Sequence, residues 1–419
     1  MNNKRISIRN VGPIKDIDLD LNKVNVFMGE QSSGKSTIAK IISFFNWIEK
    51  DISIHQSFEK YVSDENFFIE KLESFHKMKG YFNSNSELIY ISETLKINYK
   101  KEKINIEWID RYNYKRSKIS YIPSERSIVI LPEMEKVELP NNYLKSFLFD
   151  WFDSRKLFNN DNKLQLLDIG IDFYFSEKNK ENHLISNKNK YDILLSQSSS
   201  GLQSLTPLLI MCEHLIKHLY EEDQNTSYLI DEVKTKVSQE LFNNIVLNPI
   251  YNYDQLNNKE KHKIIQNLTK NLLKDSAKNK IKEYFKVTDN LFKTHYTNLI
   301  IEEPEQNLFP ATQKQLIYKL LNLINCELNH SLTITTHSPY ILYAINNCIL
   351  SFLTKEKRSI DKKTIFLETF INPKNISIYE IKDGKIKNIQ DKNGLIGSNF
   401  FDEQMKEVMD DFYIMLNYL

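Results

Sequence analysis

The stretch that decides the fold is residues 24–37, which read Val24-Asn25-Val26-Phe27-Met28 and then Gly29-Glu30-Gln31-Ser32-Ser33-Gly34-Lys35-Ser36-Thr37. Its second part matches GxxxxGK[ST], a loop that holds phosphates when it joins a strand to a helix. The mostly apolar residues before it predict a buried strand, and the apolar spacing after it, from Ile38 to Phe45, predicts a helix. We therefore expect ATP to bind at residues 29–37. The alternative is a Gly/Ser turn with a surface lysine.

The chemistry of this loop follows from its backbone. Successive N–H groups at the start of a helix carry partial positive charge and attract anions. In such a loop, Lys35 is expected to reach the β- and γ-phosphates and Ser36 to ligate Mg²⁺. Gly29 and Gly34 are two of only nine glycines in the chain, and they let the backbone approach the phosphates closely. The loop thus predicts ATP and Mg²⁺ as cofactors.

Composition narrows the class of protein. The chain has 419 residues, of which 41% are hydrophobic and 26% charged, so it can bury a substantial core. Its net charge of +1 gives no global attraction to nucleic acid, although a local basic groove is compatible with it. Three separated cysteines, Cys212, Cys326 and Cys348, argue against a disulfide scaffold or a zinc site. With no signal peptide and no apolar stretch long enough for a bilayer, we expect a cytoplasmic protein without membrane contact.

Periodicity divides the chain into a head and two insertions. Strand patterns occur at 6–11 and 14–21, around Gly12-Pro13, and buried-strand patterns recur near 298–301 and 332–335. We expect a head composed of 1–47, 119–212 and 298–345, with a mixed α/β insertion at 48–118 and a helical insertion at 213–297. Within 346–419, a hairpin turned by Asp383-Gly384 and a closing amphipathic helix are expected to complete the head.

A second segment agrees with the phosphate loop. The apolar run Asn298-Leu299-Ile300-Ile301 ends in Glu302 and Glu303, so two carboxylates follow directly on a buried strand. In a nucleotide site, one carboxylate holds the Mg²⁺ shell and the next orients or deprotonates the attacking water. We assign Glu302 to the metal and Glu303 to the water. Taken alone, a solvated acidic strand end would be an equally good interpretation.

Two further segments each have a functional and a purely structural interpretation. His337, at the end of the strand pattern 332–335, can donate to the γ-phosphate, although a lone loop histidine is more often structural. The run Ser198-Ser199-Ser200-Gly201-Leu202-Gln203 opens an apolar helix and predicts a second anion site, although alone an ordinary serine cap explains it. A two-fold dimer accounts for both anion sites, because each phosphate loop can then face the other copy's Ser-Gly helix across ATP.

Together these segments resemble the ABC-type ATPase heads of the SMC and OLD-like group, and more specifically its stand-alone bacterial AAA-family ATPases. The residues that carry the resemblance are Ile-Pro-Ser-Glu-Arg at 122–126, Ser-Ser-Gly-Leu-Gln at 199–203, Glu-Glu-Pro-Glu-x-x-Leu-x-Pro at 302–310 and Thr-His-Ser-Pro at 336–339. The resemblance implies an α/β fold with a mixed central sheet, flanking helices and an N-terminal antiparallel β subdomain.

The resemblance also implies roles by position. The signature element acting in trans would be Ser199, Ser200, Gly201 and Gln203, and the dimer-interface loop would include Pro304, Glu305 and Asn307. His337 would be the switch histidine, and Glu125 with Arg126 would lie in the region of the lid loop. Phe309 stands where the family often has histidine.

Such stand-alone ATPases are typically one subunit of bacterial anti-phage systems; Septu and PARIS look like examples. We therefore expect a homodimer or higher even oligomer that controls a separate nuclease or Toprim effector. Two alternatives stay open. The first is a head that binds or processes DNA itself, through the cations Lys100, Lys101, Lys103, Arg111, Lys115, Arg116 and Lys118 and the aromatic residues among them. The second is a nucleotide-binding scaffold with negligible turnover.

Overall fold

The computed structural model describes residues 4–64, 66–131, 134–186, 188–220, 228–269, 275–357 and 369–419. Eleven strands of this part form one mixed sheet in the order β6-β5-β4-β1-β2-β15-β14-β3-β13-β12-β7. The strands from β6 to β2 are antiparallel, whereas β14, β3, β13, β12 and β7 are parallel to one another. The predicted fold class, a mixed sheet flanked by helices with N-terminal antiparallel strands, is confirmed.

The antiparallel strands are β1 (Lys4–Val11), β2 (Ile14–Leu21), β4 (Glu87–Ile91), β5 (Leu95–Lys100) and β6 (Lys103–Trp108). The remaining strands of the sheet are β3 (Val24–Gly29), β7 (Ser117–Ile122), β12 (Tyr296–Glu302), β13 (Ser331–Thr336), β14 (Ile376–Lys382) and β15 (Lys385–Asn388). Every residue of β3 and β12 is buried, because helices cover both faces of the parallel half.

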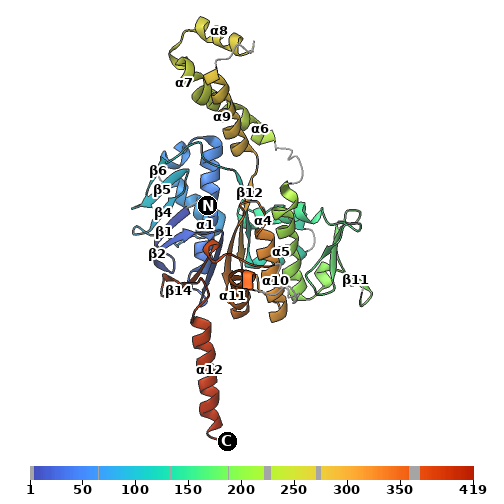
Figure 1. Ribbon diagram of the computed structural model, residues 1–419. Helices are drawn as coiled ribbons and strands as arrows, with labels where there is room; N and C mark the ends of the chain where they lie inside the picture. The colour runs from blue at the N-terminus through green and yellow to red at the C-terminus, as the bar shows by residue number, and fades with distance from the viewer. Residues whose placement is uncertain are drawn as a thin grey trace.

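Two hydrophobic cores hold the helices to the two faces of the sheet (Figure 1). One face packs against α1 (Lys35–His55), α2 (Glu59–Val62) and α3 (Phe67–His76). The opposite face packs against α4 (Tyr143–Arg155), α5 (Ser200–Ile216), α10 (Pro310–Ile324) and α11 (Pro339–Thr354). Alternate residues of β3 divide between these cores: Val26 and Met28 join the second, and Phe27 joins the first.

The first expected insertion differs from its prediction in one respect. Helix α1 does not end near residue 47 but continues to His55, because Ile48 and Ile52 keep the buried stripe going. The strands β4 to β6 then extend the head's own sheet next to β1. Residues 48–118 contain both helices and strands, and their strands share one sheet with the head.

The segment between β7 and α5 builds a side layer of the head. It contains the 3-10 turns η1 (Ser124–Ile130) and η2 (Met134–Lys136) and a separate antiparallel sheet, which ends in the turn η3 (Leu195–Gln197). The strands of that sheet are β8 (Leu164–Gln165), β9 (Asp172–Ser176), β10 (Glu181–Ser186) and β11 (Tyr191–Leu194).

The described part of the second segment, 213–297, consists mainly of helices before β12 begins. Its elements are η4 (His218–Tyr220), α6 (Tyr228–Phe242), a π-helical turn (Asn243–Leu247), α7 (Asn248–Tyr251), η6 (Tyr253–Gln255), α8 (Asn258–Thr269) and α9 (Asp275–Phe292). These helices project from the head (Figure 1) and share a small core that includes Leu241, Val246 and Leu291. No helix in the described ranges is long and apolar enough to cross a membrane.

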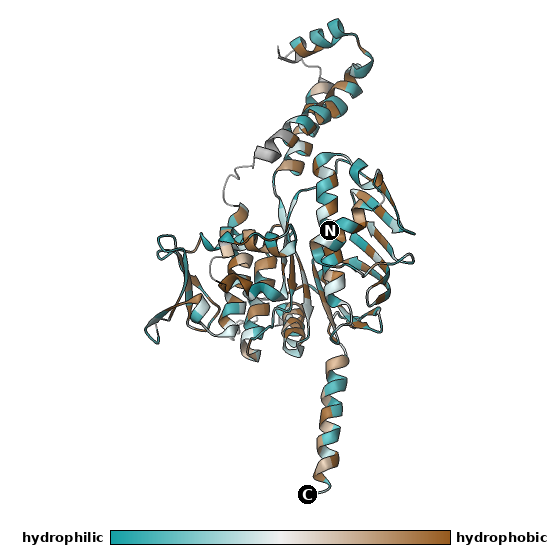
Figure 2. Ribbon diagram, turned by 180° about the vertical axis from the view of Figure 1, so that it is seen from behind, coloured by the Kyte–Doolittle hydropathy of each residue, from teal (hydrophilic) through white to brown (hydrophobic). Residues whose placement is uncertain are grey.

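The C-terminal segment splits into a buried part and an exposed part. The short turns η7 (Lys355–Lys357) and η9 (Pro373–Asn375) precede the hairpin of β14 and β15, and β14 pairs with β3 in the middle of the sheet. Helix α12 (Phe400–Leu416), however, does not complete the head, and this expectation was wrong. Only its first turn packs on the core, and it has no buried residue, so it extends away from the head (Figure 2).

Candidate functional site

The candidate site lies where three neighbouring parallel strands end. Met28 of β3 is in register with Thr336 of β13, and Thr335 of the same strand is in register with Glu302 of β12. The loops that follow these strands therefore leave the sheet at one edge, where ligands bind in open α/β sheets. The lysine loop and the tandem glutamates, which are far apart in sequence, therefore lie at the same edge, and the carboxylate of Glu303 opposes the lowering of the Lys35 pKa.

The phosphate loop needs its two glycines for steric reasons. Gly29 has a φ of 148° and Gly34 a φ of 108°, which side chains other than hydrogen rarely allow. A Cβ atom on Gly29 would lie 2.5 Å from the carbonyl oxygen of Ile381, and one on Gly34 would lie 2.3 Å from Cδ1 of Ile14. The loop is therefore wedged between the N-terminal hairpin and β14, which holds its backbone in one shape.

The side chain of Lys35 is folded into this loop. It is 4% exposed, and its Nζ donates to the carbonyl oxygens of Gly29 at 3.0 Å and Glu30 at 2.6 Å. Burial lowers the pKa of Lys35 to about 8, while the carboxylates of Glu303 and Glu305 act in the opposite direction. Ser36 is half-buried on the first turn of α1, whereas Gln31 and Ser32 are exposed at the rim of the loop.

Glu302 and Glu303 have different surroundings. Glu302 is 4% exposed, and its Oε1 forms no hydrogen bond of normal geometry within the described residues. The hydroxyl of Tyr121 lies near this carboxylate; burial raises the pKa of Tyr121, and the carboxylate raises it further. Glu303 has a φ of 44°, unusual for a residue with a side chain, and its N–H donates to the carbonyl of Thr335 at 2.9 Å. The carboxylate of Glu303 lies 3.7 Å from Nε2 of His337 and is about one-third exposed.

These residues fit a magnesium ion of the kind found in phosphate-loop sites. A buried carboxylate oxygen that forms no hydrogen bond of normal geometry with the described residues, as in Glu302, is a suitable ligand or water acceptor for a hard cation. The described residues contain no cluster of three or more His, Cys, Asp or Glu side chains that could form a cage for a metal. Mg²⁺ in such sites is held mainly by a hydroxyl, a carboxylate, phosphates and water, so Ser36 and Glu302 fit as its protein contacts.

The structure gives Glu305 a position that its sequence did not predict. Its Oε1 accepts hydrogen bonds from the backbone N–H of His337 at 2.6 Å and from Thr336 Oγ1 at 2.9 Å. Burial raises the pKa of Glu305 in spite of these bonds. Of the expected interface loop, Asn307 is exposed, whereas Pro304 is buried and Glu305 points inward. Glu305 therefore holds the histidine segment to the carboxylate loop within one chain.

His337 lies between the two halves of the site. Burial lowers its pKa first, and the nearby positive charge of Lys35 lowers it further. Its ring is about one-third exposed and faces Glu303. A neutral imidazole in this place can donate one hydrogen bond and accept another, as the switch role requires.

Arg126 does not extend as a lid residue, in contrast to its expected place beside Glu125. It is fully buried and donates to the carbonyl oxygens of Ser204, Glu302 and Glu303. Glu125 is exposed and accepts a hydrogen bond from the hydroxyl of Tyr143 at 3.0 Å. Adjacent residues on a 3-10 turn point in different directions, which is why one reaches solvent and the other the core.

The start of α5 is exposed on the surface of the head. Ser199 and Ser200 are exposed, and Ser199 forms no side-chain cap. Gln203 donates from Nε2 to the carbonyl oxygens of Ser196 and Ser198, which fixes the turn before the helix. A Cβ atom on Gly201 would lie 2.8 Å from the carbonyl oxygen of Asn307. Within the described residues, no hydrogen bond or ion pair joins Ser199–Gln203 to the phosphate loop of the same chain.

No family model matches the chain, and a search of curated proteins finds no match either. Among solved structures, it is similar to the SMC head domain from Thermotoga maritima, with 9% identity over 93% of this chain and 98% of that one and a TM-score of 0.36. It is also similar to an Smc head domain with an extended coiled coil, bound to the C-terminal domain of ScpA, from Pyrococcus furiosus, with 10% identity, coverage of 98% and 99%, and a TM-score of 0.37. The recombination mediator protein RecF gives 12% identity, coverage of 93% and 98%, and a TM-score of 0.29. TM-scores at this level support no functional argument.

Proposed function

We propose that the protein is an ATP-binding and ATP-hydrolysing molecular switch. The observation that supports this most directly is the convergence of Lys35, Glu303 and His337 at one edge of the parallel sheet. A phosphate loop alone accounts for binding. The carboxylate and imidazole beside it supply what hydrolysis needs in addition, which is a group that orients water and a donor for developing charge.

Each residue has a separable task in this proposal. Lys35 and the backbone N–H groups of residues 29–37 hold the β- and γ-phosphates, and Glu303 orients the attacking water and accepts its proton. His337 donates to the γ-phosphate and loses this contact when the phosphate leaves. Ser36 and Glu302 would hold Mg²⁺, which when bound neutralises charge on the phosphates.

The proposal includes a homodimer or higher even oligomer in which the heads close around ATP. Its support is the exposed start of α5, which has the N–H groups of an anion site but does not bond to its own phosphate loop. In a closed dimer, Ser200 and Gly201 would face the nucleotide of the other copy. Binding closes the heads and hydrolysis releases them.

The cellular role is proposed by resemblance alone. A stand-alone ATPase of this kind would be a cytoplasmic subunit of a bacterial anti-phage system similar to Septu or PARIS, and would control a separate nuclease or Toprim effector. The helices that project from the head are candidates for transmitting its state to that effector.

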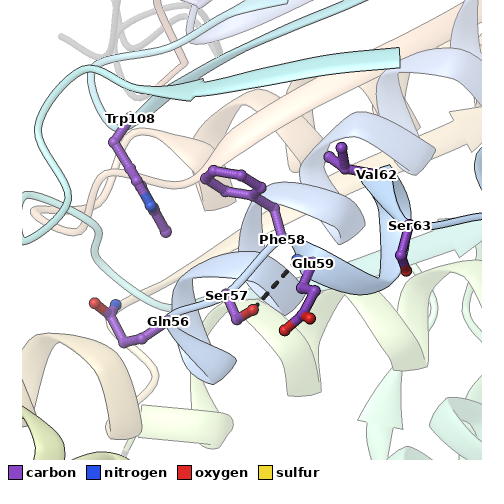
Figure 3. A pocket seen from close by; sticks show the side chains of 7 residues that line it. All are labelled: Gln56, Ser57, Phe58, Glu59, Val62, Ser63 and Trp108. Carbon is purple, nitrogen blue, oxygen red and sulfur yellow. Dashed lines mark hydrogen bonds between the residues drawn. The ribbon is translucent and has the colours of Figure 1, made fainter. Parts of the chain in front are cut away.

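The alternative that the head itself binds DNA has less support. Four of the cations proposed for it form contacts inside the chain: Lys100 with Glu87, Arg111 with Gln56 and Glu240, Arg116 with the carbonyl of Phe292, and Lys118 with Asp150. Trp108 packs at 5.9 Å from the ring of Phe58 beside a shallow cavity of about 430 Å³ (Figure 3). These side chains are committed to folding contacts. Salt-dependent DNA binding that is lost on charge reversal of Lys101 and Lys103 would revive the alternative.

A phosphate-release assay tests the proposal. The parent protein should hydrolyse ATP in the presence of Mg²⁺, and Glu303→Gln should retain nucleotide, lose turnover by roughly 100-fold or more and accumulate as a dimer. The matched control is Glu403→Gln on the exposed helix α12, which should behave as the parent does. A parent that binds ATP without turnover would instead be a nucleotide-binding scaffold, and equal turnover in Glu303→Gln and the parent would remove Glu303 from its role.

A further inference from the structure

Arg126 occupies a point where three parts of the head meet. It lies on η1, directly after β7, and its side chain is 0% exposed. Nε donates to the carbonyl oxygen of Ser204 on α5 at 3.1 Å, Nη1 to that of Glu302 at 2.8 Å, and Nη2 to that of Glu303 at 2.7 Å. One planar group thus connects the helix that begins with the Ser-Gly segment to the two glutamates.

Within the described residues, this guanidinium bonds only to backbone carbonyls. Besides those of Ser204, Glu302 and Glu303, it bonds to the carbonyl of Pro123. Burial lowers the pKa of Arg126 to about 10, so it remains charged at neutral pH. A buried charge of this kind is costly, and a lysine would offer one point charge instead of a fork of fixed donors. Arginine suits this position because its fixed donors can bond several carbonyls at the same time.

The contact with Glu303 has a specific consequence. Glu303 has a φ of 44°, a conformation that residues with a Cβ atom adopt only when their surroundings impose it. Its N–H is held by the carbonyl of Thr335, and its own carbonyl accepts from Gln306 N–H and from Arg126. This conformation places the carboxylate 3.7 Å from His337. Without Arg126, one of the bonds that impose the left-handed backbone is lost.

We propose that Arg126 is a positioning residue that holds the backbone of Glu303 in its left-handed conformation and ties that conformation to α5. This inference rests on the proposed hydrolytic function and deepens it. Because Arg126 bonds the first turns of α5 as well, any displacement of that helix is passed to the carbonyls of Glu302 and Glu303. Arg126 would therefore act through Glu303, because its side chain bonds to backbone carbonyls in the described residues.

The test is Arg126→Lys, which keeps the charge and loses the fork. We expect kcat to fall by roughly 10- to 100-fold, as for small displacements of a catalytic group, with an unchanged dissociation constant for ATP. The matched control is Arg155→Lys, the same change at a side chain that is 5% exposed and packs against Phe152 of α4 and Phe175 of β9. The melting temperature of both variants shows whether they fold, and Arg155→Lys should keep the parent's kcat.

A double variant separates positioning from general destabilisation. If Arg126 acts through Glu303, then Arg126→Lys combined with Glu303→Gln should show the same residual turnover as Glu303→Gln alone, in single-turnover phosphate release. The inference would be overturned if the two substitutions lowered turnover independently, so that their effects multiplied in the double variant. An unchanged kcat in Arg126→Lys, or a loss of ATP affinity as large as the loss of kcat, would overturn it as well. A parent without any turnover would instead contradict the proposed function, so the two failures are distinguishable.

Discussion

The phosphate loop and the start of α5 are both Ser/Gly segments that open a helix, yet the structure surrounds them differently. The phosphate loop is wedged between β14 and the N-terminal hairpin, and its lysine lies among carboxylates of the same chain. The start of α5 exposes Ser199 and Ser200, and its described contacts serve only its own turn and the 304–307 loop. The comparison teaches that the phosphate loop is held by contacts within its own chain, while the start of α5 leaves backbone donors at the surface, which we propose a second copy uses.

The largest effect is expected when the phosphate loop loses its lysine. Lys35→Ala should weaken ATP binding by roughly 100-fold, because charge-assisted hydrogen bonds to phosphate contribute about 3 kcal/mol. The melting temperature should change little, since within the described residues Lys35 bonds only to its own loop, at the carbonyls of Gly29 and Glu30 and at Oγ of Ser33. Titration calorimetry with ATP measures the loss. Lys40→Ala on the same helix, where the ammonium lies over the ring of Tyr143, is the control that should retain affinity.

The second prediction tests whether the exposed start of α5 contributes to the nucleotide site of another copy. Ser200→Arg should lower turnover by roughly 100-fold while leaving ATP binding intact. The long side chain would keep the N–H groups at the start of α5 away from the nucleotide bound to the other copy. The variant should fold, since Ser200 is exposed. Phosphate release at concentrations that favour dimers is the measurement.

Mixing variants makes this comparison decisive. Ser200→Arg and Lys35→Ala should each be inactive alone, and together they should recover turnover, because a mixed dimer contains one site with both intact halves. If the mixture stays inactive while each protein still dimerises, the start of α5 does not work in trans.

A smaller effect concerns pH. Burial lowers the pKa of Lys35 from 10.5 to about 8, so the ammonium loses its proton as pH rises through about 8. Because the charged form binds phosphate, kcat/KM should be level below that pH and fall by about tenfold per pH unit above it. The segment Ser199–Gln203 has no titratable side chain, so this decline would come from the phosphate loop and not from the start of α5. A kcat/KM that stays level to pH 9.5 would contradict it.

The smallest effect concerns Gln203. Its amide bonds the carbonyls of Ser196 and Ser198 and so fixes the turn before α5. Each such bond contributes about 1 kcal/mol, so Gln203→Ala should lower the melting temperature by about 2–4 °C. Turnover should fall only a few-fold at most. A loss as large as that of Ser200→Arg would mean that Gln203 contacts nucleotide directly.

The predictable part of the site consists of local patterns. The phosphate loop, the buried strand with Glu302 and Glu303, and the strand before His337 could be read from short segments because strand, loop and helix periods are visible there. The parallel order that brings these strands side by side then follows from the fold class, and in the structure β3, β13 and β12 are neighbouring parallel strands.

The contacts that could not be predicted are those between distant segments. Arg126 read as a possible lid residue, but the core of the head encloses it, and Glu305 read as an interface residue but bonds the backbone of His337. No local signal distinguishes an arginine that faces solvent from one that bonds four carbonyls. The amphipathic pattern of α12 showed which face could be buried, but it did not show that nothing in the described chain covers it.

The sequence by itself determined the predicted ligand class of this protein, because a phosphate loop needs glycines, a lysine and a hydroxyl at fixed spacing along one short stretch. Only the tertiary structure decided how Glu303 is held, where Arg126 points and which end of the head remains exposed. These depend on side chains that meet from opposite ends of the chain, and the energy of such contacts is set by burial and geometry rather than by neighbours in sequence.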